Sequence, residues 1–145
     1  YKVADKEAAT AFVLEHQTEL DNLVEQMKEE YEKEKRENKI LLIDRNKFST
    51  YSFLNDSKWL KQYRIVFIAI DKSDGPYKVD ILFADSPSGY EYFSVYYSEN
   101  DEPLGWEDGS ALKEEKEGFF VQRGGYYILE KEKITDHWYY YQCRT

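Results

Sequence analysis

The stretch DKEAATAFVLEHQTELDNLVEQMKEEYEKEK, residues 5–35, is the one long segment of this sequence with a helical pattern. Its apolar side chains recur at intervals of three and four positions, which places them on a single face of an α-helix. Acidic residues occur near its start and basic ones near its end, as the helix dipole favours. The stretch therefore predicts one amphipathic helix whose apolar face must pack against another element; that face is made by Ala9, Phe12, Val13, Leu20, Leu23, Val24, Met27 and Tyr31.

The length of the predicted helix limits how it can pack. A helix of this length spans about 46 Å, which exceeds the diameter of a compact domain of this chain length. The apolar face ends at Tyr31. We therefore expect residues 32–38 to project from the domain or to fray.

The chain after residue 38 consists mostly of short segments rich in aromatic and β-branched residues, with turn residues between them. Such segments are typical of β-strands. An Asp-Gly pair at 74–75 predicts a hairpin between two of them. The candidate strands are 39–44, 48–54, 63–71, 77–84, 90–98, 119–123, 126–132 and 137–143, and short helical turns are expected at Ser57–Gln62 and within 110–118.

These elements predict a single α+β domain over residues 1–145, with one long N-terminal helix packed on a curled antiparallel sheet of about six or seven strands. Cystatin-like and NTF2-like architectures share this layout. The likeness is one of architecture only, since no sequence motif of either family occurs in the chain, and it implies nothing about function.

The net charge of −9 is concentrated in two parts of the chain. Residues 1–38 carry 11 acidic and 6 basic side chains, and residues 98–117 carry 8 acidic and 2 basic ones. Binding to a phosphate backbone needs a basic face, so the sequence argues against a nucleic-acid partner. A basic protein partner is compatible with this charge. The longest apolar run, at residues 64–71, is too short for a transmembrane segment.

The sequence begins at Tyr1, without an initiator methionine or a leader of charged and then apolar residues. We expect a leader to have been removed and the protein to be extracellular or in the cell envelope, with the cytoplasm as the alternative. The single cysteine, Cys143, excludes an internal disulfide and gives no indication of the redox compartment.

Two candidate strands, 90–98 and 137–143, carry aromatic side chains on both faces. A sheet that packs on one helix needs only one apolar face, so the second aromatic set has two interpretations. It either lines a concave surface that binds a peptide, a glycan or a small molecule, or it is buried because the sheet curls strongly. The candidate ligand-binding residues are Tyr90, Tyr92, Tyr96, Tyr139 and Tyr141, with Trp106 from the loop between the strands.

Few residues suited to catalysis are present. Cys143 needs a neighbouring histidine to act as a nucleophile, and the sequence offers only His16 and His137. His137 shares a strand face with Cys143 but lies about 20 Å away along it, and His16 lies on the apolar face of the helix. All three residues are ambiguous between packing and function.

The acidic residues of the loop after residue 98 could bind calcium, which prefers clustered oxygen ligands. Their spacing does not match the EF-hand pattern, so a solvated acidic loop is the simpler interpretation. Two histidines and one cysteine are too few for a zinc site. The sequence predicts neither a metal nor a cofactor; the acids concerned are Glu99, Asp101, Glu102, Glu107 and Asp108.

We hypothesise a non-catalytic binding domain whose tyrosine-rich sheet face contacts a protein, a peptide or a glycan. The first alternative is an acidic inhibitor or immunity-type protein that caps a basic partner. The second is a small-ligand enzyme with a pocket at the mouth of the sheet, built from His16, Asp44, Tyr51 and nearby acidic residues. The lack of any catalytic motif in the sequence favours the binding domain.

Overall fold

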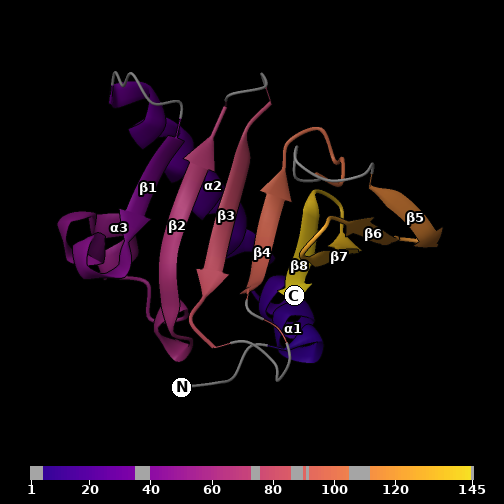
Figure 1. Ribbon diagram of the computed structural model, residues 1–145. Coiled ribbons are helices and arrows are strands. Elements are labelled where there is room, and N and C mark those ends of the chain that lie inside the picture. The colour runs from indigo at the N-terminus through magenta and orange to yellow at the C-terminus, as the bar shows by residue number, and fades with distance from the viewer. Residues whose placement is uncertain are drawn as a thin grey trace.

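Eight strands form one antiparallel sheet, and two consecutive helices pack across one of its faces (Figure 1). The computed structural model describes residues 5–34, 40–72, 76–85, 90, 92–104 and 112–144. The helices are α1 (Lys6–Glu15), α2 (Gln17–Lys33) and the short α3 (Ser52–Asn55), with 3-10 helices η1 (Arg45–Thr50) and η2 (Leu60–Gln62) on either side of α3. The strands are β1 (Ile40–Asp44), β2 (Ile65–Asp71), β3 (Lys78–Phe83), β4 (Tyr92–Ser98), β5 (Lys113–Lys116), β6 (Phe119–Arg123), β7 (Ile128–Thr135) and β8 (Trp138–Arg144). Their order across the sheet is β1-β2-β3-β4-β8-β7-β6-β5, so the predicted α+β class with an antiparallel sheet is confirmed.

The N-terminal segment forms two helices that meet at His16, so the prediction of one long helix is wrong. Asp5 caps α1 by accepting a hydrogen bond from the backbone N–H of Ala8 at 2.7 Å. His16 has a φ of −122° and a ψ of 31°, which is not a helical conformation. The break allows α1 to contact β4, β7 and β8 while α2 contacts β2. Two shorter helices can follow a curved sheet that a straight helix of about 46 Å would overshoot.

The last turn of α2 is attached to the sheet, so the expectation that the residues after Tyr31 project is wrong for Glu32. The Tyr77 hydroxyl donates a hydrogen bond to the Glu32 carboxylate, and Lys72 Nζ lies 3.6 Å from the same carboxylate. The rings of Tyr31 and Tyr77 also meet edge to face at 5.9 Å. The remainder of the predicted tail, from residue 35, lies outside the described residues.

Two segments differ from their predicted secondary structure, and the sheet has eight strands instead of six or seven. Residues 48–54, predicted as a strand, form the end of η1 and most of α3. The carbonyl of Tyr51 accepts hydrogen bonds from the backbone N–H groups of both Leu54 and Asn55, which closes a helical turn there. Residues 113–116, expected within a helical turn, form the edge strand β5 and pair with β6.

The main core lies between the sheet and the helices α1 and α2. Phe12, Leu20 and Met27 on the helices are at most 1 % exposed. Every second residue of the central strands is buried against the two helices, and the register of the strands aligns these buried residues across the sheet. They include Leu41, Ile43, Ile68, Ile70, Val79, Ile81, Phe93, Val95, Trp138 and Tyr140.

We call the side of the sheet turned away from α1 and α2 the open face. The strands β4, β8, β7 and β6 bury residues on this face too, and these form a second apolar cluster. Figure 1 shows β5, β6 and β7 at a steep angle to β1, β2 and β3, so the sheet curls over its own open face on that side. No helix of the described residues covers the open face of β1–β3 (Figure 1). Among the described helices, none is long and apolar enough to cross a membrane.

We expect Leu20→Ala to lower the free energy of unfolding by about 2 to 5 kcal/mol, because it leaves a cavity under α2. Leu14→Ala makes the same change at a leucine that is 48 % exposed, and should alter stability by no more than about 0.5 kcal/mol. Urea denaturation of both variants measures the difference. Equal losses would contradict the placement of α1 and α2 on the sheet.

Candidate functional site on the open face

Three of the candidate tyrosines are buried on the open face. Tyr96, Tyr139 and Tyr141 are 0 %, 2 % and 9 % exposed. The rings of Tyr96 and Tyr139 stack with their centroids 5.3 Å apart, and the Tyr141 ring lies 6.0 Å from that of Tyr96. These rings are covered by the curled part of the sheet and not by the helices. Their cluster also contains Leu129 and Cys143, and Leu104, Phe120 and Tyr127 pack against it. For these three rings the structure agrees with the interpretation of a curled sheet.

The other candidates are dispersed. Tyr92 is 45 % exposed near one end of β4. Tyr90 is half-buried, and its hydroxyl lies 3.4 Å from a carboxylate oxygen of Glu130. Trp106 lies outside the described residues. The described candidates therefore form one buried group and two separate positions closer to solvent, not a continuous aromatic surface.

Lys131, on β7, lies at the centre of the buried tyrosines, and no sequence pattern singled it out. It is 1 % exposed, and its Nζ lies 4.3 Å from the ring centroid of Tyr96 and 5.0 Å from that of Tyr141. Burial and the charge of Lys78 lower the pKa of the Lys131 ammonium well below its usual range, while the charge of Asp80 opposes the change. A buried amine is thus enclosed by aromatic rings, with one carboxylate to favour its charged form.

Asp80, on β3, links this cluster to the centre of the sheet. Its carboxylate accepts a hydrogen bond from the buried Ser94 hydroxyl, and the Tyr141 hydroxyl lies 3.4 Å from it. Burial first, and then the charge of Asp80, raises the pKa of Tyr141 above its usual range, and burial does the same for Tyr96. Both phenols stay neutral; the Tyr96 hydroxyl accepts a hydrogen bond from the backbone N–H of Leu104 at 3.3 Å. The cluster therefore holds the curled strands together.

A second polar contact holds the segment after β4 over the buried tyrosines. Asp101 accepts hydrogen bonds from Lys133 Nζ at 2.7 Å and from the backbone N–H of His137 at 2.9 Å, and the Tyr139 hydroxyl lies 3.1 Å from it. Burial opposes ionisation, but these hydrogen bonds, led by that of Lys133, lower the pKa of the Asp101 carboxyl. Its φ of 53° lies in the left-handed region. Asp101 is thus a clamp between the loop and the β7–β8 hairpin.

The described part of the acidic loop does not gather its carboxylates into a cation site. Asp101 is engaged as described, and Glu99 Oε2 lies 3.0 Å from Lys28 Nζ on α2. Glu107 and Asp108 lie outside the described residues. Within the ranges that the structure describes, no group of three or more His, Cys, Asp or Glu residues is arranged to hold a metal ion.

The three ambiguous residues lie apart from one another. The His16 ring stacks on Trp59 at 5.1 Å on the helix side of the sheet. Cys143 is 1 % exposed on the open face, so the sheet separates it from His16. His137 occupies the β7–β8 turn, where its Nδ1 lies 3.0 Å from the carbonyl oxygen of Ser98. None of these contacts pairs a histidine with the thiol.

The residues of the hypothetical enzyme pocket contact different neighbours. Asp44 lines a groove together with Val66 at the end of β1. The Tyr51 ring packs on Phe53 at 5.9 Å, and His16 packs on Trp59. The three groups do not converge on a common point.

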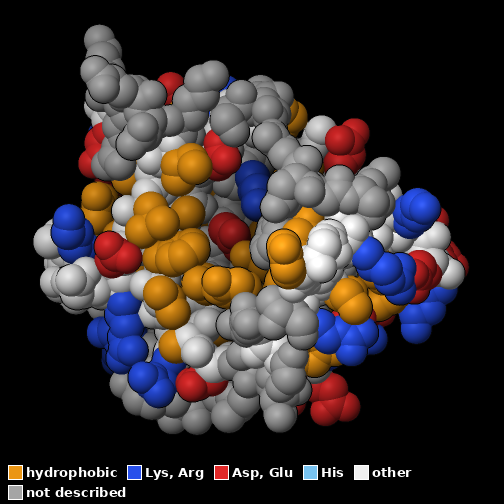
Figure 2. Space-filling view, viewed as in Figure 1, with side chains coloured by type: hydrophobic (Ala, Val, Ile, Leu, Met, Phe, Trp, Pro, Cys, Tyr) orange, Lys and Arg blue, Asp and Glu red, His pale blue; other side chains and the backbone are white. Residues whose placement is uncertain are grey.

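An exposed apolar surface on β1, β2 and β3 is the feature that sequence reasoning missed. Ile40 and Leu42 on β1 are 47 % and 43 % exposed, and Val66, the extra residue of a bulge in β2, is 39 % exposed. The half-buried Phe67 and Leu82, paired with each other on the open face, extend this surface. We call these five residues the apolar patch. Figure 2 shows hydrophobic side chains grouped on this side of the molecule, beside a hollow that contains an acidic side chain.

The signal for the patch was present in the sequence of β1, which is ILLID. A strand that buries only one face alternates apolar and polar residues. In β1, however, Ile40 and Leu42 on the open face are as apolar as Leu41 and Ile43, which are buried on the other face. That pattern indicates either cover on both faces or an exposed apolar face. The exposure of Ile40 and Leu42, with no described helix over the open face of β1, decides for the second.

Comparisons of this chain with family models, with curated proteins and with solved structures find no match.

We expect Lys131→Met to stabilise the protein near neutral pH, because it removes an amine that must be buried at a cost in solvation. Folding lowers the pKa of Lys131, so the cost of burying its ammonium reduces the stability of the protein most at low pH. This reduction in stability disappears as the pH rises towards the ordinary lysine pKa of 10.5. The advantage of the variant should therefore shrink between about pH 6 and pH 9, where tyrosines are still protonated in both states. Urea denaturation across this range measures it.

Lys133→Met is the matched control for that experiment. The hydrogen bond with Asp101 raises the pKa of Lys133. The stability that the charged Lys133 contributes is therefore fully present at every pH below the ordinary lysine pKa. This variant should be destabilised by a constant amount over the same pH range. Parallel behaviour of the two variants would contradict the assignment of Lys131 as the buried, destabilised amine.

We expect Asp101→Ala to lower the free energy of unfolding by about 2 to 4 kcal/mol. The variant loses the charge-assisted hydrogen bonds of the carboxylate. Alanine also keeps a Cβ at a positive φ, where no side-chain hydrogen bond then offsets the backbone strain. Asp101→Gly loses the same hydrogen bonds but relieves the backbone, so it should be about 1 kcal/mol more stable than the alanine variant. Thermal or urea denaturation separates the two effects. Variants within about 0.5 kcal/mol of the parent protein would refute the clamp.

Proposed function

We propose that this protein is a non-catalytic interaction domain that binds an extended, cationic polypeptide segment along β1, over the apolar patch. The observation that carries the proposal is the exposure of Ile40 and Leu42 on an edge strand. Exposed apolar side chains gathered on one surface favour association with another chain. A strand at a sheet edge also has backbone groups that can pair with an added strand.

The two edges of the sheet differ in a way that supports this choice. The edge strand β5 has the sequence KEEK, and all four of its residues are exposed. Charged side chains of this kind discourage the pairing of a further strand. The edge strand β1 is ILLID, with neither lysine nor proline, and it carries part of the apolar patch. Strand addition is therefore discouraged at β5 and favoured at β1.

The charges next to the patch favour a cationic segment. Asp44 follows Leu42 on the open face at one end of β1, and Asp71 is paired with Ile40 at the other end. The patch is thus bordered by a carboxylate at each end of the strand. The chain as a whole carries a net charge of −9, which would attract a basic partner over a longer range.

The tyrosine-rich face takes an indirect part in this proposal. Tyr96, Tyr139 and Tyr141 are buried with Lys131 and are not contact residues. Their cluster fixes the curl of β4, β8 and β7, while β1–β3 stay uncovered beside it. Tyr92 is 45 % exposed on the open face of β4, which is separated from β1 by β2 and β3.

A second candidate function is an acidic cap on a basic protein, through the outer surface of α2. The observation in its favour is a row of exposed carboxylates on that helix: Glu19, Asp21, Glu25, Glu29 and Glu32. Charge reversal at Glu25 and Glu29 would weaken such a complex. The same reversal should leave binding at β1 nearly unchanged, so it separates the two functions.

The proposal is tested by NMR titration with a short peptide that alternates apolar residues with threonine and has a lysine at each end. We expect saturable shifts of the backbone amides of Ile40–Asp44, and weaker binding at high salt because surface charge is screened. A peptide with glutamate in place of both lysines should bind at least about tenfold more weakly, which corresponds to about 1.4 kcal/mol.

Leu42→Glu should abolish the shifts, and Leu14→Glu is its matched control, since Leu14 is a leucine of similar exposure on α1. Both variants should remain folded by circular dichroism because both side chains are exposed. Equal binding by the two variants would overturn the proposal. So would a dimer of the parent protein that Leu42→Glu dissociates, because a second copy of the chain would then be the occupant of β1.

A further inference from the structure

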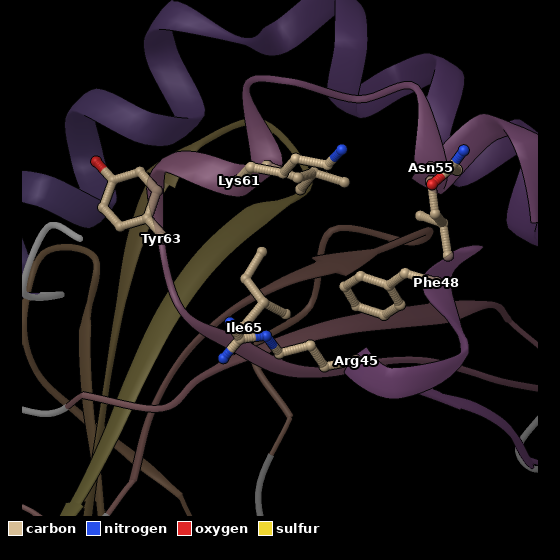
Figure 3. Close-up of a pocket in the computed structure, with 8 residues that line it drawn as sticks. Arg45, Phe48, Asn55, Lys61, Tyr63 and Ile65 are labelled. Carbon is tan, nitrogen blue, oxygen red and sulfur yellow. The ribbon is translucent and has the colours of Figure 1, made fainter.

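A small cavity of about 180 Å³ lies between α2 and the connection that joins β1 to β2; we call it the α2 cavity. The connection consists of η1, α3 and η2, and Figure 3 shows these turns below the N-terminal helices, around a separate cavity that Phe48 and Ile65 border. Trp59, which precedes η2, stacks on His16 at 5.1 Å and contacts the Phe12 ring at 5.5 Å. These ring contacts hold the connection against the two helices, so the walls of the α2 cavity are in place before any ligand binds.

One wall of the α2 cavity is a stripe of side chains on α2. Glu19, Asn22, Leu23 and Gln26 are spaced by three and four positions, so they share one face of the helix. Leu23 is 4 % exposed and joins this wall to the main core. The other three residues are exposed and provide a carboxylate and two amide oxygens, all of which accept hydrogen bonds.

The opposite wall of the α2 cavity is aromatic. It is made by the half-buried Phe53 and Trp59, with Ser57 between them in the sequence. The Ser57 hydroxyl donates a hydrogen bond to the carbonyl oxygen of Phe53 at 2.6 Å, so its own oxygen can still accept one. The faces of aromatic rings attract cations, and tryptophan attracts them most strongly.

The charges of the α2 cavity favour a cation. Among the described residues, no lysine or arginine belongs to its lining. Glu19 Oε1 lies 3.9 Å from His16 Nδ1, which is too far for a hydrogen bond, and in the described part of the chain the Glu19 carboxylate has no lysine or arginine partner. Glu19 and Trp59 both lie next to His16, so the carboxylate and the indole are at the same end of the cavity.

We propose that the α2 cavity binds a small primary amine in its ammonium form. The ammonium lies beside the Trp59 ring and donates hydrogen bonds to the Glu19 carboxylate and to the amide oxygen of Asn22, one helical turn away. The apolar body of the amine extends along the wall towards Leu23 and Phe53.

The size of the α2 cavity limits the ligand. A volume near 180 Å³ is below the usual range for drug-sized ligands, so the body of the amine is a short chain or a single ring. The cavity lies on the helix side of the sheet, whereas the apolar patch is on the open face. This site is therefore independent of the polypeptide partner proposed for β1.

The test uses butylamine and 2-phenylethylamine as probes near neutral pH, where simple amines are charged. Both should cause saturable NMR shifts of the Trp59 indole N–H and of the Asn22 side-chain amide in the intact protein. Butanol has the same apolar body without the charge, and butyrate has the opposite charge. Each should bind at least about tenfold more weakly than butylamine, a difference of about 1.4 kcal/mol.

Glu19→Gln should weaken butylamine binding about tenfold, because it removes the negative charge and keeps the length of the side chain. Glu7→Gln is the matched control: Glu7 is an exposed glutamate on α1 outside the lining, so its loss should leave binding unchanged. Both side chains are exposed, so both variants should fold like the parent protein.

Asn22→Lys provides a second, independent variant, since the added ammonium next to Glu19 should compete with the ligand and abolish binding. Asn46→Lys makes the same change at an exposed asparagine outside the lining and should not affect binding. Three outcomes would overturn the proposal: no saturable shift with either amine, equal binding of butylamine and butanol, or equal effects of Glu19→Gln and Glu7→Gln. Shifts confined to Ile40–Asp44 would also overturn it, because they would place the amine at the carboxylates beside the apolar patch.

Discussion

The fold depends on one constraint: the aromatic side chains on both faces of β4 and β8 must be shielded from water. These neighbouring strands carry aromatic rings on each side, and side chains alternate strictly across a strand. The helices α1 and α2 cover one side, where Phe93 and Tyr140 stack at 5.7 Å. The chain has no further long helix in its described part to cover the other. The sheet meets the requirement by curling, so that β6 and β7 and the segment held by Asp101 close over Tyr96 and Tyr139.

This solution leaves an asymmetric molecule. The strands β4, β8, β7 and β6 form a closed half with side chains packed on both faces, while β1, β2 and β3 have helices on one face only. The closed half also contains the buried Lys131, and the half-buried Asp80 of β3 lies at its border; the charges of both are more costly to bury than apolar groups would be. Such groups restrict the strands to one register, since a shift by one residue would turn Lys131 to the other face. The exposed face of the other half is then the surface that can meet another molecule.

The sequence predicted several of these features for sound reasons. The alternation of Phe93 and Val95 with Tyr92 and Tyr96 placed two aromatic sets on opposite faces of one strand, and the register confirms it. The spacing of Phe12, Leu20 and Met27 placed one helical face in the core. Other features could not be predicted from the sequence. The break at His16 depends on the curvature of the sheet and on the stack with Trp59, a residue far along the chain.

The candidate sites show the same division. Tyrosine spacing identified which rings share a face, but their exposure depends on strands that pair from the far end of the chain, and β7 brings Lys131 against Tyr96 in a way that no local pattern records. The turns η1, α3 and η2 fold back on β2 around a cavity, although local alternation predicted a strand at residues 48–54.

The fold class, most of the antiparallel strands and the faces on which their side chains lie follow from the sequence alone, because helical and strand periodicities are local properties of the chain. Tertiary structure alone decided which faces stay exposed. Exposure depends on what packs on a residue from elsewhere in the chain, and the curl that buried the tyrosines of β4 and β8 left Ile40 and Leu42 without cover.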